Sequence, residues 1–337
     1  MPLVFDPASR VAAATTGLLL DDDGYRRRFE RTRHEHLNIL RDGWFPAGLT
    51  DHQGIVRQLV NHRLDLATMR QQRHWPGAQI ATTDDPAGAV AETCRTSRAV
   101  IDAMRAKGDA VFGLTAGNET RVLLAICRDI APEITFTTVD ALETQLDITR
   151  ATEIAGRFGL QHRRLPVRMA TEAHARTWHA RTGHTVGRPN MWRHRTVAPL
   201  GEARAFIAGL GGEIGRAFFW RASDTVETEI GPETIVARFG MPPHACVSEA
   251  VARWHPSVAP FDAFLRLDLA YLELRVGCWG FASAYANPAV FNMNPMISRC
   301  AFQAMLSLPP DWRRENRMIT EAIAQHSPEL LDLPINR

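Results

Sequence analysis

The sequence predicts an α/β protein built on a doubly wound parallel sheet, with a helical C-terminal part. Two observations predict this fold class. Between residues 85 and 167, short apolar runs alternate with segments of helical periodicity, which is typical of an open parallel sheet. A further apolar run at 205–209 predicts another central strand and precedes a glycine-rich loop. Beyond about residue 230 the pattern becomes helical with breaks at prolines.

The elements of this alternation follow one another along the chain. A helix is expected from Asp85 to Lys107, where small and apolar residues recur at helical spacing until Gly108. The run Ala110–Leu114 is short and apolar, which is typical of a buried parallel strand. The remaining predicted elements are a helix at 120–129, a strand at 134–139, a helix at 146–158 that ends at Gly159, and a strand at 161–167.

We expect the chain to form two parts, with one boundary near residue 84. Residues 1–84 would form a small irregular N-terminal region, in which the run 56–66 alternates enough to predict a strand or two. Residues 85–337 would form the main domain. Within it, the glycine- and tryptophan-containing segment 176–195 is interpreted as a loop able to close over a substrate.

Composition argues against several classes of protein. The formal net charge is +2, so no electrostatic argument favours nucleic acid or a membrane surface as a partner. No apolar run approaches the ~18 residues of a membrane-spanning helix and no signal-peptide pattern opens the chain, so a cytoplasmic location is expected. The five cysteines lack CxxC spacing, which argues against a disulfide framework and a zinc site.

Two loops carry the residues that predict chemistry. The first, Leu114-Thr115-Ala116-Gly117, lies between a strand and a helix, where small side chains let backbone N–H groups approach an anion. Thr120 and Arg121 follow at the start of that helix. The second loop, Gly209–Glu213, follows the apolar run at 205–209. Ligands of open α/β sheets bind where such loops converge, although each loop taken alone is equally a tight turn that binds nothing.

Each loop contains one carboxylate, Glu119 in the first and Glu213 in the second. Mg²⁺ prefers oxygen ligands and is commonly shared between carboxylates and substrate phosphates. Two carboxylates that meet beside phosphates therefore predict a Mg²⁺ site. In the alternative interpretation, each glutamate is a solvated residue that the helix dipole stabilises.

These motifs resemble those of a known family. Leu114–Arg121 resembles the Ser-Gly-Gly-x-Asp-Ser loop of the asparagine-synthetase-like ATP pyrophosphatases, in its Thr-Ala-Gly-x-Asp-Ser-Arg variant. The segment 135–140 resembles the family's second strand, 147–162 the helix after it, and 209–213 its second loop, whose carboxylate binds magnesium. Together with looser likeness at 59–66, 73–76, 306–309 and 328–334, the resemblance spans about residues 55–335.

The resemblance implies the ATP-pyrophosphatase type of sheet and an ATP-dependent synthetase. A carboxylate would attack the α-phosphorus of ATP to give an acyl-adenylate and pyrophosphate, and an amine or ammonia would then capture the adenylate as an amide. Both substrates would be small molecules, with ATP and Mg²⁺ as cofactors. The implied metal ligands are Glu119 and Glu213, and the implied ATP-binding residues are Leu114, Thr115, Ala116, Gly117, Thr120, Arg121, Thr138, Val139, Gly209 and Gly211.

Three residues outside the loops are also candidates. Glu273 and Arg275 lie in the mostly apolar run 272–279, where the family places residues that face the substrate; Glu273 is a candidate catalytic residue and Arg275 a candidate substrate-binding residue. A purely structural pairing of Glu273 is the alternative. Arg317, in an arginine-rich stretch with Arg313 and Arg314, is a candidate for neutralising phosphate charge, and a solvated helix face is its alternative.

The chain also departs from the family pattern. Glutamate replaces aspartate in both loops, Leu210 stands where asparagine and β-lactam synthetases carry polar residues, and Lys107 is the only lysine, so the family's late lysine has no counterpart. The segment before the loops is too short for a glutaminase and has no cysteine after Met1. Two alternatives therefore stay open: a weakly catalytic or purely binding protein, and a synthetase subunit fed by a separate glutaminase. A homodimer is a further possible assembly.

Overall fold

The computed structural model describes residues 3–37, 45–166, 171–173, 175–176, 178, 205–280 and 290–334. The loop expected at 176–195 lies almost entirely outside them. The chain forms two compact units, which we describe one at a time. The first contains residues 3–79, 219–280 and the few described residues at 171–178. The second contains residues 80–166, 205–218 and 290–334.

The second unit is built on a five-stranded sheet of order β10-β9-β6-β7-β8, in which every pair is parallel. Its strands are β6 (Ala110–Gly113), β7 (Thr135–Asp140), β8 (Gln161–Pro166), β9 (Ala205–Ile207) and β10 (Phe291–Met293). The chain runs outward from β6 through β7 to β8, then returns to the other side of β6 with β9. This order confirms the predicted doubly wound α/β class.

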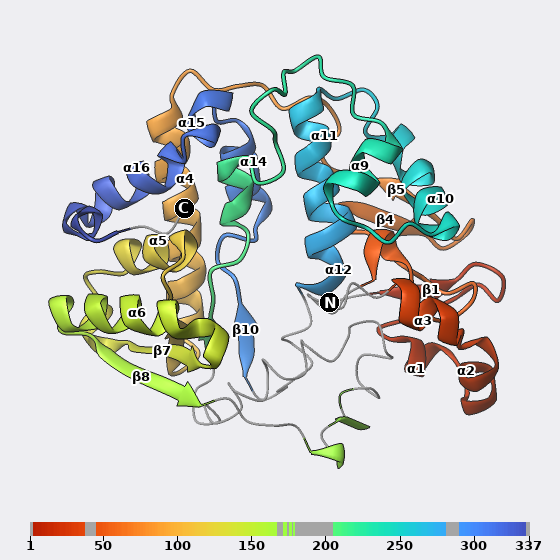
Figure 1. The fold of residues 1–337 in the computed structure, drawn as a ribbon, viewed down its shortest axis with the longest axis horizontal. Coiled ribbons are helices and arrows are strands. Elements are labelled where there is room, and N and C mark those ends of the chain that lie inside the picture. The colour runs from red at the N-terminus through yellow and green to blue at the C-terminus, as the bar shows by residue number, and fades with distance from the viewer. Residues whose placement is uncertain are drawn as a thin grey trace. The chain divides into compact units, whose positions relative to one another are not determined.

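Helices connect these strands as the sequence predicts. They are α4 (Pro86–Arg105), α5 (Asn118–Ile126) and α6 (Gln145–Phe158), with the 3₁₀ turns η2 (Ala131–Glu133) and η3 (Leu142–Thr144) between them. Asp85 caps α4, because its carboxylate accepts the Gly88 N–H at 2.9 Å. Gly159 ends α6 in the left-handed conformation, with φ of 63°. Helix α6 packs against β7 and β8, and α4 and α5 contact each other (Figure 1).

The C-terminal part of the second unit is helical, as predicted. It contains α14 (Arg299–Leu306), α15 (Pro310–Arg314), α16 (Arg317–His326) and the 3₁₀ helix η8 (Pro328–Asp332). Helix α14 packs on α4, and α16 packs on α5 (Figure 1). The wholly buried side chain of Arg121, in α5, donates to the carbonyl oxygens of Leu333 and Pro334 at 2.7 and 2.8 Å. The end of the described chain is thereby fixed to α5.

Strand β10 is the element of this sheet that the sequence did not predict. It has three residues, pairs with β9 at the sheet edge, and leaves Phe291 59% exposed. A strand this short and this exposed shows neither a buried apolar run nor an alternation long enough to detect.

The first unit combines β-structure near the N-terminus with helices from later in the chain. Strands β1 (Val4–Asp6), β2 (Val11–Ala13) and β3 (Val56–Arg57) form an antiparallel sheet, and β4 (His62–Asp65) pairs with β5 (Arg70–Arg73). Strands β3 and β4 confirm the strands expected at 56–66. Short helices lie between β2 and β3: α1 (Thr16–Leu19), α2 (Asp22–Arg28), α3 (Arg31–Leu37) and η1 (Pro46–Gly48).

The later helices of this unit are α9 (Pro232–Arg238), α10 (Ala245–Trp254), η6 (His255–Ser257), α11 (Ala263–Ala270), η7 (Tyr271–Val276) and α12 (Gly277–Trp279). The run from α11 through α12 is one continuous helical segment (Figure 1). Its middle, η7, is a π-helix, a rare geometry that often accompanies functional sites. Sequence reasoning divided the chain once, near residue 84, whereas this unit joins two stretches that are distant in sequence. Among the described helices, none has the length and apolar character needed to cross a membrane.

Replacing Arg121 by methionine should destabilise the second unit. The change removes charged hydrogen bonds to two carbonyl oxygens, one of them buried, so we expect the free energy of unfolding to fall by about 2–4 kcal/mol in urea titrations followed by circular dichroism. The control is Arg105→Met, which breaks a surface pair with the 68%-exposed Glu133 and should cost less than about 1 kcal/mol. Equal losses in the two variants would contradict a structural role for Arg121.

Candidate functional site

The topology of the second unit brings the two predicted loops together. Strands β6 and β9 are hydrogen-bonded neighbours, with Ala110 opposite Ala205 and Phe112 opposite Ile207. The strand that follows β6 along the chain is β7, on one side of this pair, and the strand of this sheet that follows β9 is β10, on the opposite side. The loops that leave their carboxyl ends therefore lie at the switch point, where open α/β sheets bind ligands.

The first loop is held in shape by its own side chains. The Thr115 hydroxyl accepts the Gly117 N–H at 3.0 Å and lies 2.9 Å from the Thr120 hydroxyl. The Ala116 N–H donates to the Asp147 carboxylate at 2.8 Å. In this state the amides of Ala116 and Gly117 already have acceptors, so an anion in the loop would have to replace those contacts.

The first turn of α5 has backbone N–H groups that no side chain of the N-cap residue accepts. Gly117 is the N-cap residue and supplies no side-chain acceptor to the first turn. The N–H groups of Asn118, Glu119 and Thr120 belong to that turn, where a helix has no internal acceptors for them. The Oδ1 atom of Asn118 is buried and accepts no hydrogen bond from the described residues. An uncapped N-terminus at a switch point is suited to bind phosphate.

The second loop touches the first because it lacks side chains at two positions. A Cβ atom added at Gly209 would lie 2.8 Å from Glu119 Cβ and 2.9 Å from the Thr120 nitrogen. A Cβ atom at Gly212 would lie 2.6 Å from Glu119 Cγ. Gly211 has a φ of 106°, a conformation that favours glycine. Glu119 is therefore seated directly against the second loop, whose glycines permit that approach.

The two predicted metal ligands form an acidic pair. Burial, and then the charge of Glu119, raise the pKa of the Glu213 carboxyl above its usual value, whereas its hydrogen bond from the Gly211 N–H and the charge of Arg216 oppose the rise. That hydrogen bond joins Gly211 N to Glu213 Oε2 at 2.8 Å. Arg216, at the end of η5 (Gly212–Arg216), donates from Nε to Glu119 Oε1 at 2.9 Å. One guanidinium thus binds Glu119 and acts on Glu213 through its charge.

The acidic pair fits a Mg²⁺ ion in part. The hydrogen bonds to the Glu213 carboxylate come from backbone N–H groups, and the one to Glu119 comes from Arg216. Carboxylate oxygens are the ligands that Mg²⁺ prefers. The described residues contain no group of three or more metal-binding side chains. Glu119 and Glu213 therefore suit an ion whose remaining ligands are phosphate oxygens and water.

Thr138 and Val139 lie at the end of β7, the strand next to β6. The buried Thr138 hydroxyl lies 2.6 Å from the Leu114 carbonyl oxygen and 2.8 Å from His162 Nε2. Burial lowers the pKa of His162, so this imidazole is neutral near pH 7. Val139 is partly exposed and its carbonyl accepts the Thr144 hydroxyl at 2.6 Å. These contacts fix the first loop to β7 and leave the Val139 side chain accessible.

The arginine-rich stretch contributes to the second loop through Arg313. This buried side chain donates twice to the Ile214 carbonyl oxygen, at 3.0 and 2.6 Å, and so positions η5. Arg317, the predicted catalytic residue, is about half-exposed, and its ion pairs in the described part of the chain are with Glu315 and Asp311. The alternative interpretation of Arg317, a solvated helix face, agrees with these contacts.

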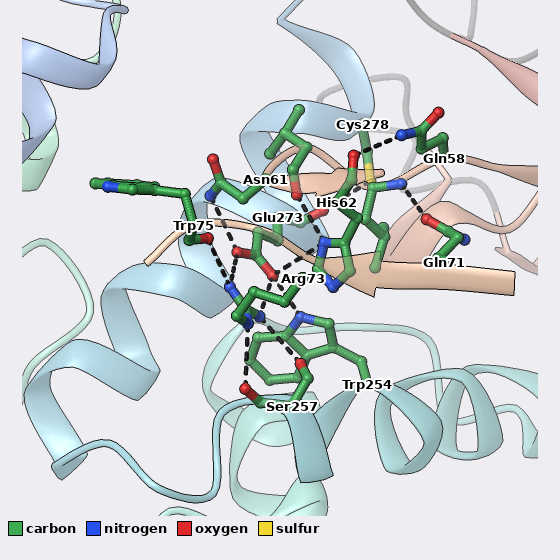
Figure 2. A network of polar contacts seen from close by, with 12 residues as sticks. Gln58, Asn61, His62, Gln71, Arg73, Trp75, Trp254, Ser257, Glu273 and Cys278 are labelled. Carbon is green, nitrogen blue, oxygen red and sulfur yellow. Dashed lines mark hydrogen bonds and ion pairs between the residues drawn. The ribbon is translucent and has the colours of Figure 1, made fainter. Parts of the chain in front are cut away.

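Glu273, the other predicted catalytic residue, lies in η7 of the first unit and has no exposed surface. Its carboxylate accepts hydrogen bonds from Arg73 at 2.5 and 2.7 Å, from the Trp254 indole at 2.6 Å and from Asn61 at 3.0 Å (Figure 2). Arg73 also donates to the carbonyl and hydroxyl oxygens of Ser257, each at 3.1 Å. This network attaches β5 to the helices, and it favours the structural alternative for Glu273.

Arg275, the predicted substrate-binding residue, lies two positions further along η7. Its guanidinium carbon is 5.2 Å from the centre of the Phe219 ring and 6.0 Å from that of Tyr271. Both are cation–π distances, so the structure gives Arg275 an aromatic environment within the first unit.

Sequence reasoning missed three residues of the loop site. Arg216 was not considered, although it stands three positions after Glu213 in a loop with no other basic residue. Asp147 begins the segment 147–162 that resembles the family's helix, and the resemblance implies no role for its carboxylate. Asn118 stands at the variable position x of the family's loop. An arginine directly after an acidic glycine loop is the one signal that the sequence offered.

Comparisons with known proteins add little to this geometry. No protein-family model matches the chain, and no curated protein matches it. Among solved structures, the chain is similar to the NMN synthetase of Francisella tularensis, with 10% identity and a TM-score of 0.26 over 69% of this chain and 95% of that one. A likeness at that TM-score supports no conclusion about function.

Replacing Gly209 by alanine should test the close approach of the two loops. The new Cβ atom would overlap backbone and side-chain atoms of α5, so we expect the free energy of unfolding to fall by about 1–3 kcal/mol. The control is Gly156→Ala in α6, where a Cβ atom meets nothing within 4 Å. That change should stabilise by about 0.4–1 kcal/mol, because alanine is the better helix former. Two changes of the same sign would contradict the packing.

Replacing Arg73 by methionine should test the buried network of Figure 2. The change leaves the Glu273 carboxylate buried without its cation, so we expect the first unit to lose about 3–5 kcal/mol of stability. Arg26→Met, which removes an exposed pair with Asp23, is the control and should cost less than about 1 kcal/mol. Urea titration measures both, and a loss at Arg73 no larger than at Arg26 would contradict the network's structural role.

Proposed function

We propose that the second unit binds ATP together with Mg²⁺ and uses it to activate a carboxylate, with AMP and pyrophosphate as products and an amide as the final product. One observation carries the proposal. Glu119 is seated against Gly209 and Gly212, which joins two glycine-containing loops into one site at the switch point of a doubly wound sheet. The resemblance of both loops to asparagine-synthetase-like motifs supplies the reaction class.

The proposed binding residues follow from the contacts of the first loop. Phosphate oxygens would accept hydrogen bonds from the uncapped N–H groups of α5 and from the hydroxyls of Thr115 and Thr120. Val139 would lie against the adenine ring. Arg121 stays in the proposal only as a support for α5, because its guanidinium is already bound to Leu333 and Pro334.

The residues of this chain would promote the reaction by position and charge. A carboxylate oxygen attacks the α-phosphorus, the bond to the bridging oxygen breaks, and pyrophosphate leaves. The amine nitrogen then attacks the acyl carbon, and AMP leaves as the amine loses a proton. When bound, Mg²⁺ supplies positive charge at the phosphate oxygens. Glu119 and Glu213 would hold it, while α5 orients the phosphates, so that little covalent chemistry is asked of the protein.

A second candidate function is nucleotide binding without turnover. The contacts that favour it are those already made in the site: Arg216 occupies one oxygen of Glu119, and Asp147 and Thr115 occupy loop amides. A protein that keeps these contacts would bind nucleotide weakly and release no pyrophosphate.

ATP binding and pyrophosphate release distinguish the two functions. We expect calorimetry to detect ATP binding in the presence of Mg²⁺, and Glu213→Gln and Thr120→Val to weaken it at least about tenfold. Thr149→Val is the control, because its hydroxyl lies on the exposed face of α6 and contacts only the Gln145 carbonyl oxygen there.

Pyrophosphate release is then measured with ATP, Mg²⁺ and a panel of amino and hydroxy acids, each with an amine or ammonia. Release that depends on one acid would support the synthetase. Binding without release for any acid would favour the binding protein, and the absence of ATP binding would exclude both functions.

A further inference from the structure

The site contains a basic residue that the family resemblance does not account for. Arg216 lies in η5, three residues after Glu213, and its guanidinium is one-quarter exposed. Its Nε atom donates to Glu119 Oε1 at 2.9 Å, and its guanidinium carbon lies 5.0 Å from the centre of the Phe218 ring. The ion pair and the aromatic ring hold the charge beside Glu119.

The charges around Arg216 do not balance. Glu119 is buried and Glu213 is half-buried, and the charges of Glu119 and Arg216 both act on the Glu213 carboxyl. Two carboxylates and one guanidinium leave one negative charge over. A single arginine therefore offsets one of the two negative charges that a divalent cation would otherwise neutralise.

The Arg216 guanidinium has N–H donors beyond the one that binds Glu119. An arginine carries five N–H donors in a planar fork that suits phosphate oxygens. In the described part of the chain, Arg216 uses only its Nε–H in a hydrogen bond, so both terminal nitrogens can take further acceptors. The neighbouring Asn118 Oδ1 is likewise buried and accepts no hydrogen bond there.

We propose that Arg216 occupies the place of the divalent cation at Glu119 while the site holds no nucleotide, and that its guanidinium turns to phosphate oxygens when ATP and metal bind together. This inference rests on the proposed function and adds a residue to it. Metal ion and guanidinium are both cations, and they compete for the Glu119 carboxylate. The acidic pair therefore takes a metal ion poorly until phosphates offer Arg216 another partner.

Binding of Mn²⁺ alone, followed by electron paramagnetic resonance, tests the first half of the inference. We expect weak binding to the wild-type chain without nucleotide, and binding at least about tenfold tighter in Arg216→Met, because the acidic pair has lost its internal cation. Arg216→Lys keeps the charge and should resemble the wild type. Arg105→Met, a half-buried arginine paired with Glu133 in the same unit, is the matched control and should change nothing.

The double variant Arg216→Met with Glu119→Gln locates the effect. It should lose the Mn²⁺ affinity that Arg216→Met gains, because one ligand of the pair is gone. Circular dichroism and thermal unfolding confirm that each variant is folded. Mn²⁺ affinity that stays the same in folded Arg216→Met, or that survives the loss of Glu119, would overturn the inference.

Calorimetry with ATP and Mg²⁺ tests the second half. Arg216→Met should bind ATP several-fold more weakly than the wild type, whereas Arg105→Met should not. Unchanged ATP affinity in Arg216→Met would overturn the transfer of the guanidinium to phosphate. If the wild-type chain binds no ATP at all, the proposed function fails, and the Mn²⁺ measurement still decides whether Arg216 takes the cation's place.

Discussion

The site depends on the contact between Glu119 and two glycines of another loop. Gly209 and Gly212 lie so close to this side chain that neither position has room for a Cβ atom. The contact forms because β6 and β9 are neighbours in the sheet, although they lie far apart along the chain. The approach of the two loops thus sets where the acidic pair, the start of α5 and Arg216 lie relative to one another.

Arginine side chains make several of the buried polar contacts in this chain, which has one lysine. Arg121 binds two carbonyl oxygens beside α5, Arg313 binds a carbonyl oxygen of η5, and Arg73 binds Glu273 in the first unit. Each of these uses two or more nitrogens of one planar group, which a lysine ammonium cannot reproduce in the same geometry. Arg216 differs, because it uses one nitrogen and keeps the others available.

The sequence predicted the parts of this protein that local patterns determine. The strands and helices from α4 to β8 are visible as apolar runs and helical periodicity, and their alternation implies the sheet. The meeting of the two loops followed from a general rule about that sheet. Strand β10 is too short for any pattern. Arg216 lies 97 residues from Glu119, and Arg73 lies 200 residues from Glu273. Only the folded chain therefore shows that Glu119 lies in the candidate site, whereas Glu273 is buried in a structural network.

The π-helix η7 sets the direction in which the side chains of α12 point. An α-helix turns by about 100° per residue, and a π-turn accommodates one residue more than an α-turn does. If the same residues wound as an ordinary α-helix, every later side chain of α12 would be turned by about 100° and would face a different direction. The carbonyl of Cys278, which accepts a hydrogen bond from the buried Arg57, would be carried out of reach. The contact between Arg57 and Cys278 therefore depends on the π geometry, which absorbs the additional residue of this turn.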